Sequence, residues 1–397
     1  MSPSLRFPEF TGEWKEERLS EIADIYKGAG ISKDQLSDNG EPCILYGELY
    51  TKYKTETITE VISRTDIDNT KLVRSKANDV IIPCSGETAE DIATARCVIK
   101  DGILLGGDLN IIRLHNYDGS FVSYQLNGKR KYDIAKVAQG VSVVHLYGEH
   151  LKGVKTVNPC LAEQKKISRF LSLLDARIAV QNRLIDRLQS LMIGLNNSLY
   201  EQYGNDITTS FMELGYSYSG LSGKSAKDFG SGKPFITYLN VYSNIIVDET
   251  DYQYVRINDG EKQNIVRTGD VLFTLSSETP EEVGIGSVYL GEKEVYLNSF
   301  CFGIHIERNQ LAYSPYLSYY VTSTAFRKFI YPFAQGSTRF NLCKADFEKA
   351  SIKLPSLDNQ KRISAMLDCI AEKIRAEKAI LEHYNIQRQY LLRQMFI

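Results

Sequence analysis

The chain has 397 residues, which is enough for two or three domains with a core each. Its hydrophobic content of 43% and charged content of 24% exclude a disordered or fibrous protein. A net charge of -2 gives no sign of nucleic-acid binding, and seven cysteines without a Cys-x-x-Cys pair argue against a disulfide framework and a zinc site. No apolar run is long enough to span a bilayer and the start does not resemble a signal peptide, so we expect a cytoplasmic protein.

The sequence contains two copies of one unit. Residues 161–171 read LAEQKKISRFL and residues 357–367 read LDNQKRISAML, identical at six of eleven positions. Four more segments recur in the same order, with a spacing that drifts only from 191 to 196 residues. These pairs are LSEIADIYKG with FMELGYSYSG, EPCILYGELY with KPFITYLNVY, NDVIIPCSGET with GDVLFTLSSET, and AQG with AQG. One match would be noise, but five in one order indicate a duplication.

Each copy begins with a globule that mixes strands and helices. Short apolar runs between Gly, Asp and Asn turns predict strands, among them residues 79–83 and 109–114 in the first copy and 270–275 and 300–306 in the second. One helix is predicted before each AQG, at residues 123–137 and 318–333. The fold class is therefore α/β (α+β), with globules at residues 1–160 and 201–356.

Each copy ends with a long helix, at residues 161–200 and 357–397. Apolar residues recur in alternating steps of four and three for about four heptads, which predicts a coiled coil with helices roughly 50–60 Å long. The first seam is Ile167, Leu171, Leu174, Ile178, Gln181, Ile185, Leu188, Met192, Leu195 and Leu199. The second is Ile363, Leu367, Ile370, Ile374, Glu377, Leu381, Tyr384, Arg388, Leu391 and Met395. Gln181 and Glu377 occupy equivalent polar seam positions, which favours a role in fixing register over chemistry.

Additional apolar side chains lie beside the seams, where a two-stranded coil does not need them. They either pack on the globule of their own copy or dock helices of another protein, and the sequence favours neither alternative. They are Phe170, Leu184, Leu191, Met366 and Ile380.

The motifs of catalysis are nearly absent. GLSGKS at residues 220–225 is too short for a phosphate loop, and VNPCL at residues 157–161 lacks the second proline of an adenine-methyltransferase motif and any cofactor loop. His145 and His150 have no third metal ligand nearby. The residues therefore predict no catalytic, metal or cofactor site.

Polar recognition chemistry is present in both globules, which are rich in tyrosine (25 in the chain). Lys and Arg neutralise phosphates, while Gln, Ser, Thr, Tyr and Arg reach base edges; the alternative is a solvated surface. The first copy offers Lys129, Arg130, Lys131, Gln139, Gly140, Ser142, Tyr46 and Tyr50. The second offers Arg327, Lys328, Gln335, Gly336, Ser337, Thr338, Arg339, Tyr238 and Tyr242. The helical segments 163–200 and 360–397 carry a net positive charge, so a DNA-binding face must be a local patch on an acidic body.

This organisation resembles the specificity subunit of type I restriction–modification systems. The resemblance rests on FPEFTGEWKEERLSEIADIYKG at the start, on the Pro-x-Leu-x-x-Gln-Lys-(Lys/Arg)-Ile openings of both helices, and on the two AQG loops. It covers essentially the whole chain, with Asn359 standing where the first copy has Glu163.

The resemblance implies two target recognition domains, each reading one half of a split double-stranded DNA site. It implies an antiparallel coiled coil that holds them apart and binds two methyltransferase subunits, which restriction subunits join. The chain would then be no enzyme, with S-adenosylmethionine, Mg and ATP bound only by partner subunits. The alternative is a coiled-coil scaffold whose globules bind protein or peptide; a methyltransferase or nuclease in its own right is disfavoured by the missing motifs.

Overall fold

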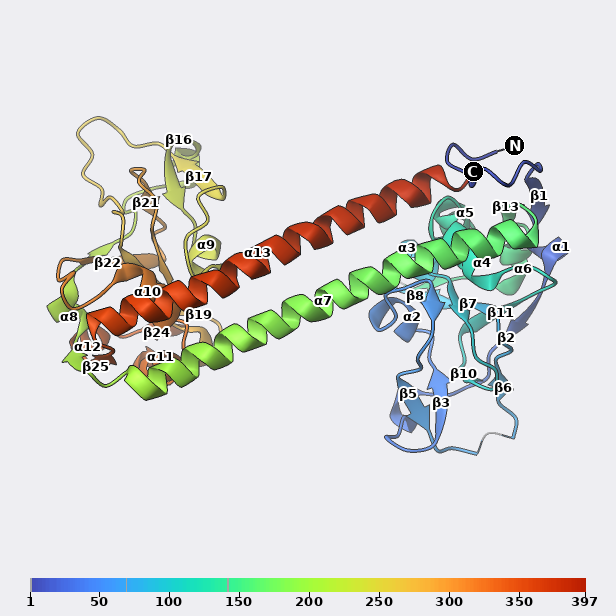
Figure 1. The fold of residues 1–397 in the computed structure, drawn as a ribbon, viewed down its shortest axis with the longest axis horizontal. Coiled ribbons are helices and arrows are strands. Elements are labelled where there is room, and N and C mark those ends of the chain that lie inside the picture. Colours follow the sequence, from blue (N-terminus) through green and yellow to red (C-terminus); the bar gives the residue numbers. More distant parts are fainter. Residues whose placement is uncertain (1, 69, 141–142) are drawn as a thin grey trace. The chain divides into compact units, whose positions relative to one another are not determined.

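The structure, a computed structural model, describes residues 2–68, 70–140 and 143–397. The chain forms two compact units (Figure 1). Unit 1 comprises residues 1–183 and 379–397, and unit 2 comprises residues 184–378. No described helix is long and apolar enough to cross a membrane.

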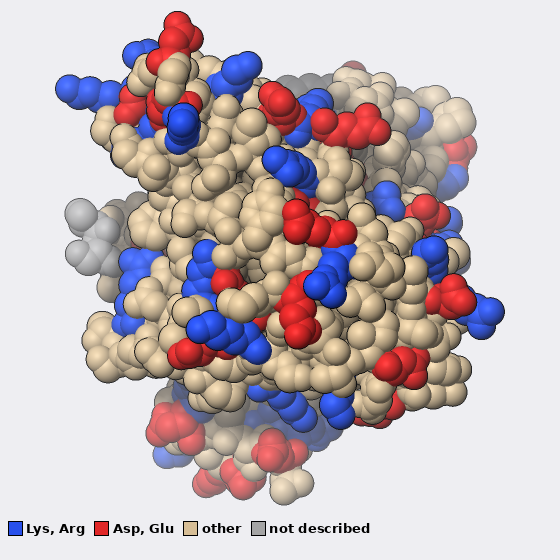
Figure 2. Space-filling model, turned by 90° about the vertical axis from the view of Figure 1, so that its left-hand side faces the viewer, with Lys and Arg blue, Asp and Glu red and all other residues tan. Residues whose placement is uncertain are grey.

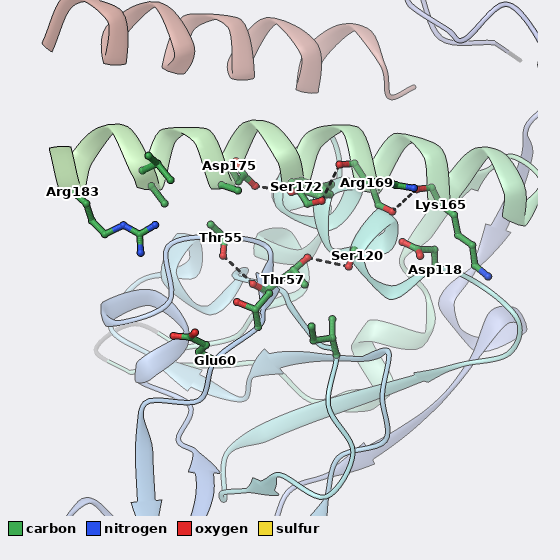
Figure 3. A pocket seen from close by; sticks show the side chains of 17 residues that line it. Thr55, Thr57, Glu60, Asp118, Ser120, Lys165, Arg169, Ser172, Asp175 and Arg183 are labelled. Carbon is green, nitrogen blue, oxygen red and sulfur yellow. Dashed lines mark hydrogen bonds between the residues drawn. The ribbon is translucent and has the colours of Figure 1, made fainter. Parts of the chain in front are cut away.

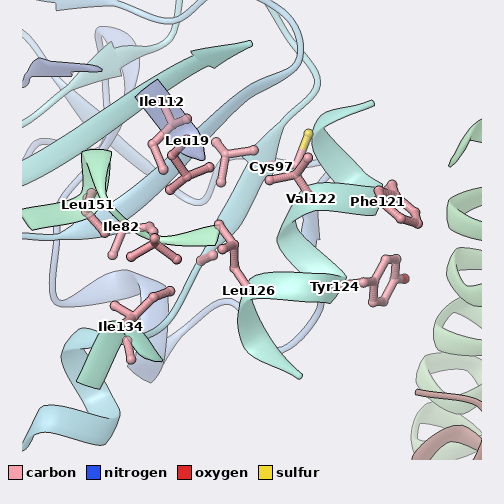
Figure 4. Close-up of a cluster of buried hydrophobic side chains, with 14 of the residues drawn as sticks. Leu19, Ile82, Cys97, Ile112, Phe121, Val122, Tyr124, Leu126, Ile134 and Leu151 are labelled. Carbon is pink, nitrogen blue, oxygen red and sulfur yellow. The ribbon is translucent and has the colours of Figure 1, made fainter. Parts of the chain in front are cut away.

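Unit 1 is built on a five-stranded sheet that is buried on both faces. Its strand order is β2 (Ala23–Lys27), β11 (Leu109–Leu114), β7 (Asp79–Pro83), β9 (Arg96–Val98) and β4 (Thr57–Ile58). All pairs are antiparallel except β4 with β9. Val80 and Ile82 face one hydrophobic cluster, drawn in Figure 4, while Ile81 faces another. Burial of both faces explains why β7 is a continuous apolar run without alternation.

Smaller elements complete unit 1. A second sheet has the order β5 (Ser63–Thr65), β3 (Glu41–Ile44), β10 (Leu104–Leu105), β6 (Val73–Arg74). Two-stranded ladders join β1 (Lys15–Arg18) to β13 (Lys155–Asn158), and β8 (Ser85–Gly86) to β12 (Val144–His145). The short helices are α1 (Leu19–Ile22), η1 (Lys33–Gln35), α2 (Glu48–Thr51), α3 (Ala89–Ile92), α4 (Gly119–Asn127), α5 (Lys131–Val137) and α6 (Gly148–Lys152).

Unit 2 repeats this plan. Its central antiparallel sheet has the order β15 (Gly215–Ser219), β22 (Cys301–Ile306), β18 (Val271–Thr274), β20 (Gly286–Val288). The other sheets are β17 (Tyr252–Val255), β16 (Phe229–Ile236), β21 (Tyr296–Leu297); β14 (Ile207–Thr209), β25 (Ile352–Leu354); and β19 (Ser276–Ser277), β24 (Phe340–Leu342), β23 (Ala334–Gln335). The short helices are α8 (Phe211–Leu214), η2 (Ala226–Asp228), α9 (Tyr238–Ser243), η3 (Pro280–Glu282), α10 (Ser314–Tyr320), α11 (Thr324–Ile330), η4 (Tyr331–Phe333) and α12 (Lys344–Lys349).

The single helix predicted before each AQG is wrong, because each is two helices. In unit 1 the chain breaks at Gly128, whose N–H closes α4 on the carbonyl of Tyr124 at 3.0 Å before α5 begins. In unit 2, Ser323 accepts a hydrogen bond from the N–H of Phe326 and starts α11 as a new helix. Gly at a helix end and Ser at a helix start are the residues that such ends favour.

The two long helices are α7 (Leu161–Tyr203) and α13 (Leu357–Gln394), so the first ends three residues later than predicted. Their predicted seams are confirmed, because every seam residue is buried or half-buried. In unit 1, Ile167 and Leu171 share a core with Leu391 and Met395. The start of α7 therefore lies beside the end of α13, as in an antiparallel pair.

Unit 2 shows the reciprocal arrangement. Ile363 and Leu367, at the start of α13, join the core against which Leu195 and Leu199 of α7 pack. Gln181 and Glu377 are 9% and 5% exposed at their matched seam positions. Each unit thus combines the beginning of one long helix with the end of the other, which gives the duplicated chain its pseudo-two-fold plan.

Candidate nucleic-acid interface

The paired tyrosines lie on or just before short helices at matched places in the two units. In unit 2, the rings of Tyr238 and Tyr242 stack at 5.9 Å between centroids. The Tyr238 hydroxyl donates to the carbonyl of Ser276 at 2.9 Å, and the Tyr242 hydroxyl donates to Glu282 at 2.9 Å. The Glu282 carboxylate also accepts from Ser277, and these hydrogen bonds lower its pKa.

In unit 1, Tyr50 lies on the matching helix α2, and Tyr46, which is 36% exposed, lies in the turn just before it. Burial raises the pKa of Tyr50, and the nearby Tyr46 adds to this effect. Both line a cavity of about 890 Å³ together with the loop at residues 30–36. A buried polar residue anchors each helix by hydrogen bonds to the backbone. In α2, Glu48 accepts from the N–H of Leu45, and in α9, Asn240 donates to two backbone carbonyls.

Each AQG segment begins a short hairpin. In unit 2 this hairpin lies next to Ser276, whose carbonyl accepts from the Tyr238 hydroxyl. In unit 1 the backbones of Gln139 and His145 exchange hydrogen bonds of 2.9 and 2.7 Å, and His145 pairs with Ser85 of β8. In unit 2, Gln335 pairs with Asn341, which in turn pairs with Ser276 of β19. We call the group of Gln139, His145 and Ser85 loop cluster 1, and the group of Gln335, Asn341 and Ser276 loop cluster 2.

Several predicted residues come together in these clusters. Gln335, Gly336, Ser337, Thr338 and Arg339 are exposed on or next to the hairpin of loop cluster 2. Gln139 and Gly140 are exposed on the hairpin of loop cluster 1. Ser142 lies outside the described residues.

The predicted basic residues divide into two kinds. The Arg327 guanidinium donates to the carbonyls of Glu281, Val283 and Gly284 at 2.6–2.8 Å, and burial lowers its pKa. These hydrogen bonds hold the Arg327 guanidinium on the backbone of residues 281–284, and its predicted DNA contact stays a prediction. Arg130 similarly lies within 3.5 Å of Asp133 and of the carbonyl of Ile397. Lys129 and Lys328 are exposed, and Lys131 is half-buried.

A polar groove of about 690 Å³ runs between α7 and the loop at residues 55–60 (Figure 3). In it the Thr57 hydroxyl donates to that of Ser120 at 3.0 Å, while the hydroxyls of Thr55, Ser168 and Ser172 donate to backbone carbonyls. Its charged residues are of both signs, namely Lys165, Arg169, Arg183, Glu60, Asp118 and Asp175. Neither histidine nor cysteine is found among the described residues that line it.

The wider surface has mixed charge. On the face drawn in Figure 2, lysines and arginines alternate with aspartates and glutamates among uncharged residues.

No group of three or more potential metal ligands occurs among the described residues. Burial raises the pKa of the thiols of Cys43 and Cys84 to about 11, so these cysteines stay protonated near neutral pH.

The apolar residues beside the seams are exposed by 37–55%. Phe170 packs edge-on against Phe7 of its own unit at 5.9 Å between ring centroids. Leu184, Leu191, Met366 and Ile380 remain exposed on the long helices. The two alternatives left open by the sequence thus divide between residues: Phe170 packs on its own globule, and the other four present apolar surface outward.

Comparison with known proteins identifies the family of this chain. A model of the type I restriction modification DNA specificity domain matches residues 11–190 and again residues 221–383. The chain therefore belongs to this family, and each copy of the repeat carries one such match.

Individual relatives are distant. The chain is 27% identical over 150 residues to the StySPI specificity subunit of Salmonella potsdam, covering 38% of this chain and 32% of that protein. It is 21% identical over 403 residues to the MjaVIII specificity subunit of Methanocaldococcus jannaschii, covering 95% and 91%.

Two solved structures share the fold. The S subunit of a type I restriction–modification system from M. genitalium matches with a TM-score of 0.61 at 16% identity, covering 100% of this chain and 99% of that one. A chain from a structure describing assembly and conformational transition of the type I R-M system matches with 0.58 at 17% identity, covering 97% of both.

Sequence reasoning missed several side chains of the loop clusters. Ser85 and Ser276 stand at the same place in the repeated PCSGET and TLSSET segments, a signal that could have been read. Asp108 and Phe300 follow no motif, and only the folded backbone brings them to the hairpins.

Proposed function

We propose that this chain is the DNA-reading subunit of a type I restriction–modification complex. Each unit reads one half of a split double-stranded site, and the long helices dock two methyltransferase subunits, which restriction subunits join. The observation that carries the proposal is the presence of two loop clusters with the same backbone and different side chains, within a chain whose two copies both match the specificity-domain family. A duplicated scaffold with unlike readers suits an asymmetric bipartite site.

We further propose that the chain has no catalytic activity and binds no cofactor of its own. S-adenosylmethionine, Mg and ATP then belong to the partner subunits. The raised pKa of the thiols of Cys43 and Cys84, which keeps both protonated near neutral pH, supports this part of the proposal. Seven free cysteines support a reducing cytoplasm as its location.

The exposed loop residues point to phosphate and base contacts made by small patches. We propose that Lys129 and Lys328 neutralise phosphates and that Gln139, Gln335 and Arg339 reach base edges, because all five are exposed and of the types that make these contacts. Binding should therefore combine a salt-dependent term with a sequence-dependent one.

The test uses the full chain purified with and without its methyltransferase subunit. Affinity for a duplex containing the site is measured from 50 to 200 mM salt, on the scale at which counterion release is resolved. Methylation is then mapped across a genome. The proposal expects a steep salt dependence and a split motif that the methyltransferase alone does not modify. Salt-independent binding, or methylation or cleavage by the isolated chain, would overturn it.

A further inference from the structure

The two loop clusters correspond bond by bond. In unit 1, the N–H of Cys84 donates to the carbonyl of Asp108 at 2.7 Å, and the N–H of Leu146 donates to the carbonyl of Cys84 at 2.8 Å. In unit 2, Leu275 donates to Phe300 at 2.8 Å, and Leu342 donates to Leu275 at 2.8 Å. The backbone positions of Asp108 and Phe300 are therefore equivalent, although the two side chains share no chemistry.

A second pair is matched by the hairpin turns. Gly140 and Gly336 have φ values of +127° and +143°. A Cβ at Gly140 would meet the carbonyl oxygen of Val143 at 2.0 Å, and one at Gly336 would meet that of Arg339 at 2.1 Å. Val143 and Arg339 thus occupy the same position in the two hairpins.

Both loop clusters have a serine at the matched position, Ser85 or Ser276, although the residues that it contacts differ. In unit 1, Ser85 Oγ donates to Asp108 at 3.4 Å, and Lys27 Nζ lies 3.8 Å from the same carboxylate. In unit 2, Ser276 Oγ accepts from the Arg339 guanidinium at 3.2 Å. Ser85 and Ser276 follow equivalent strands, so each serine orients the variable group of its own cluster.

The variable side chains are turned outward. Phe300 is 54% exposed, with its N–H fixed on Asn298 at 2.9 Å, and the Arg339 guanidinium lies 5.7 Å from its ring centroid. Val143 is 53% exposed, and the Asp108 side chain is 51% exposed. An exposed phenylalanine under an arginine holds the guanidinium fork in a defined plane, since cations and ring faces attract.

We propose that the pairs Asp108/Val143 and Phe300/Arg339 determine which base each unit reads. This inference rests on the proposed function and names the residues that make the two readers different. Arg339 presents the paired donors that match O6 and N7 of guanine, while Phe300 positions it. Asp108 presents an acceptor for the amino group of cytosine, and Val143 an apolar surface for a thymine methyl. Unit 2 therefore selects a guanine where unit 1 does not.

The test maps methylation by the full complex carrying Arg339→Ala or Arg339→Lys. Both variants should lose discrimination for one guanine in one half-site by roughly 10- to 100-fold, because lysine keeps the charge without the fork. The other half-site should be unchanged. Asp108→Asn should do the reverse, altering only the half-site that Arg339 does not affect. Phe300→Leu should weaken the same guanine preference as Arg339→Ala.

The failure of this inference is distinguishable from that of the proposed function. If Arg339→Ala reduces methylation equally at all sequences, or leaves the methylated motif unchanged, the base assignment is overturned. Methylation of a split site by the wild-type complex would still uphold the reader function in that case. Absence of any split motif with the wild-type chain overturns both. Copurification with the methyltransferase shows that each variant is folded.

Discussion

Arg388, six residues before the end of α13, donates from Nε to the carboxylate of Asp175 on α7 across 2.6 Å. The Nη2 atom of the same guanidinium pairs with Glu56. The Tyr124 hydroxyl donates to the second carboxylate oxygen of Asp175 at 2.6 Å. Asp175 and Glu56 are each only 6% exposed. The matched seam position in α7 is Met192, so this ionic network occurs in one copy only.

Replacing Arg388 by Met, the residue of the matched position, should destabilise unit 1. Two buried carboxylates would lose their cation, a change that costs about 3–5 kcal/mol when one partner of a buried pair is removed. Denaturant unfolding of the wild-type and variant chains measures the difference in their free energy of unfolding.

The rescue variant combines Arg388→Met with Asp175→Asn and Glu56→Gln, and should recover most of the loss because no buried charge remains unpaired. Met192→Leu is the control, expected to change stability by less than about 1.5 kcal/mol. A loss below about 1 kcal/mol for Arg388→Met would show that water already screens the network.

Arg327 and Lys328 are neighbours on α11 with different expected roles. Arg327→Met leaves three carbonyls without their donor and should cost about 2 kcal/mol of stability. Lys328→Ala should leave stability unchanged and weaken binding to all duplexes alike, with a shallower salt dependence. Thermal unfolding and duplex titration measure the two effects. The same phenotype for both variants would contradict this division of roles.

The parts of this fold that follow from local pattern were predictable from the sequence. Ile167, Leu171, Ile363 and Leu367 recur at heptad spacing, and the spacing alone determines that they face a partner helix. The strand at residues 79–83 was equally readable, because the buried residues that follow Asp79 form a continuous apolar run.

The remaining features depend on contacts far apart in sequence. The break at Ser323 follows from one side-chain cap inside an otherwise helical pattern. Arg388 was visible as an irregular seam residue, but its partner Glu56 lies 332 residues away. Arg327 was predicted as a DNA contact from its residue type, and the sequence does not show that its guanidinium donates to backbone carbonyls of residues 281–284. The equivalence of Asp108 and Phe300 likewise exists only in the hydrogen bonds of the folded backbone.

Leu191 and Met366 should contribute to docking of the methyltransferase. They are 55% and 49% exposed on α7 and α13, so Leu191→Gln and Met366→Gln should not disturb the fold. Burial of such side chains at an interface is worth about 1.5–3 kcal/mol each. The double variant should therefore copurify with the methyltransferase at least about tenfold less well, as measured by titration. Ser198→Gln, an exposed change on the same helix, is the control. Equal affinity of wild type and double variant would place docking elsewhere.

Gly140→Ala and Gly336→Ala should each disturb one reader and spare the other. Both glycines have a positive φ that disfavours alanine, and in both the new Cβ would collide with a carbonyl oxygen at about 2 Å. The hairpin must therefore shift, moving Val143 in one variant and Arg339 in the other. Methylation mapping should show an altered first half-site for Gly140→Ala and an altered second half-site for Gly336→Ala, with the partner half-site intact. Gly194→Ala, in a helix with open space around it, should leave both half-sites as they are and stabilise the helix by roughly 1 kcal/mol. If either hairpin variant changed both half-sites, the two loop clusters could not be independent readers.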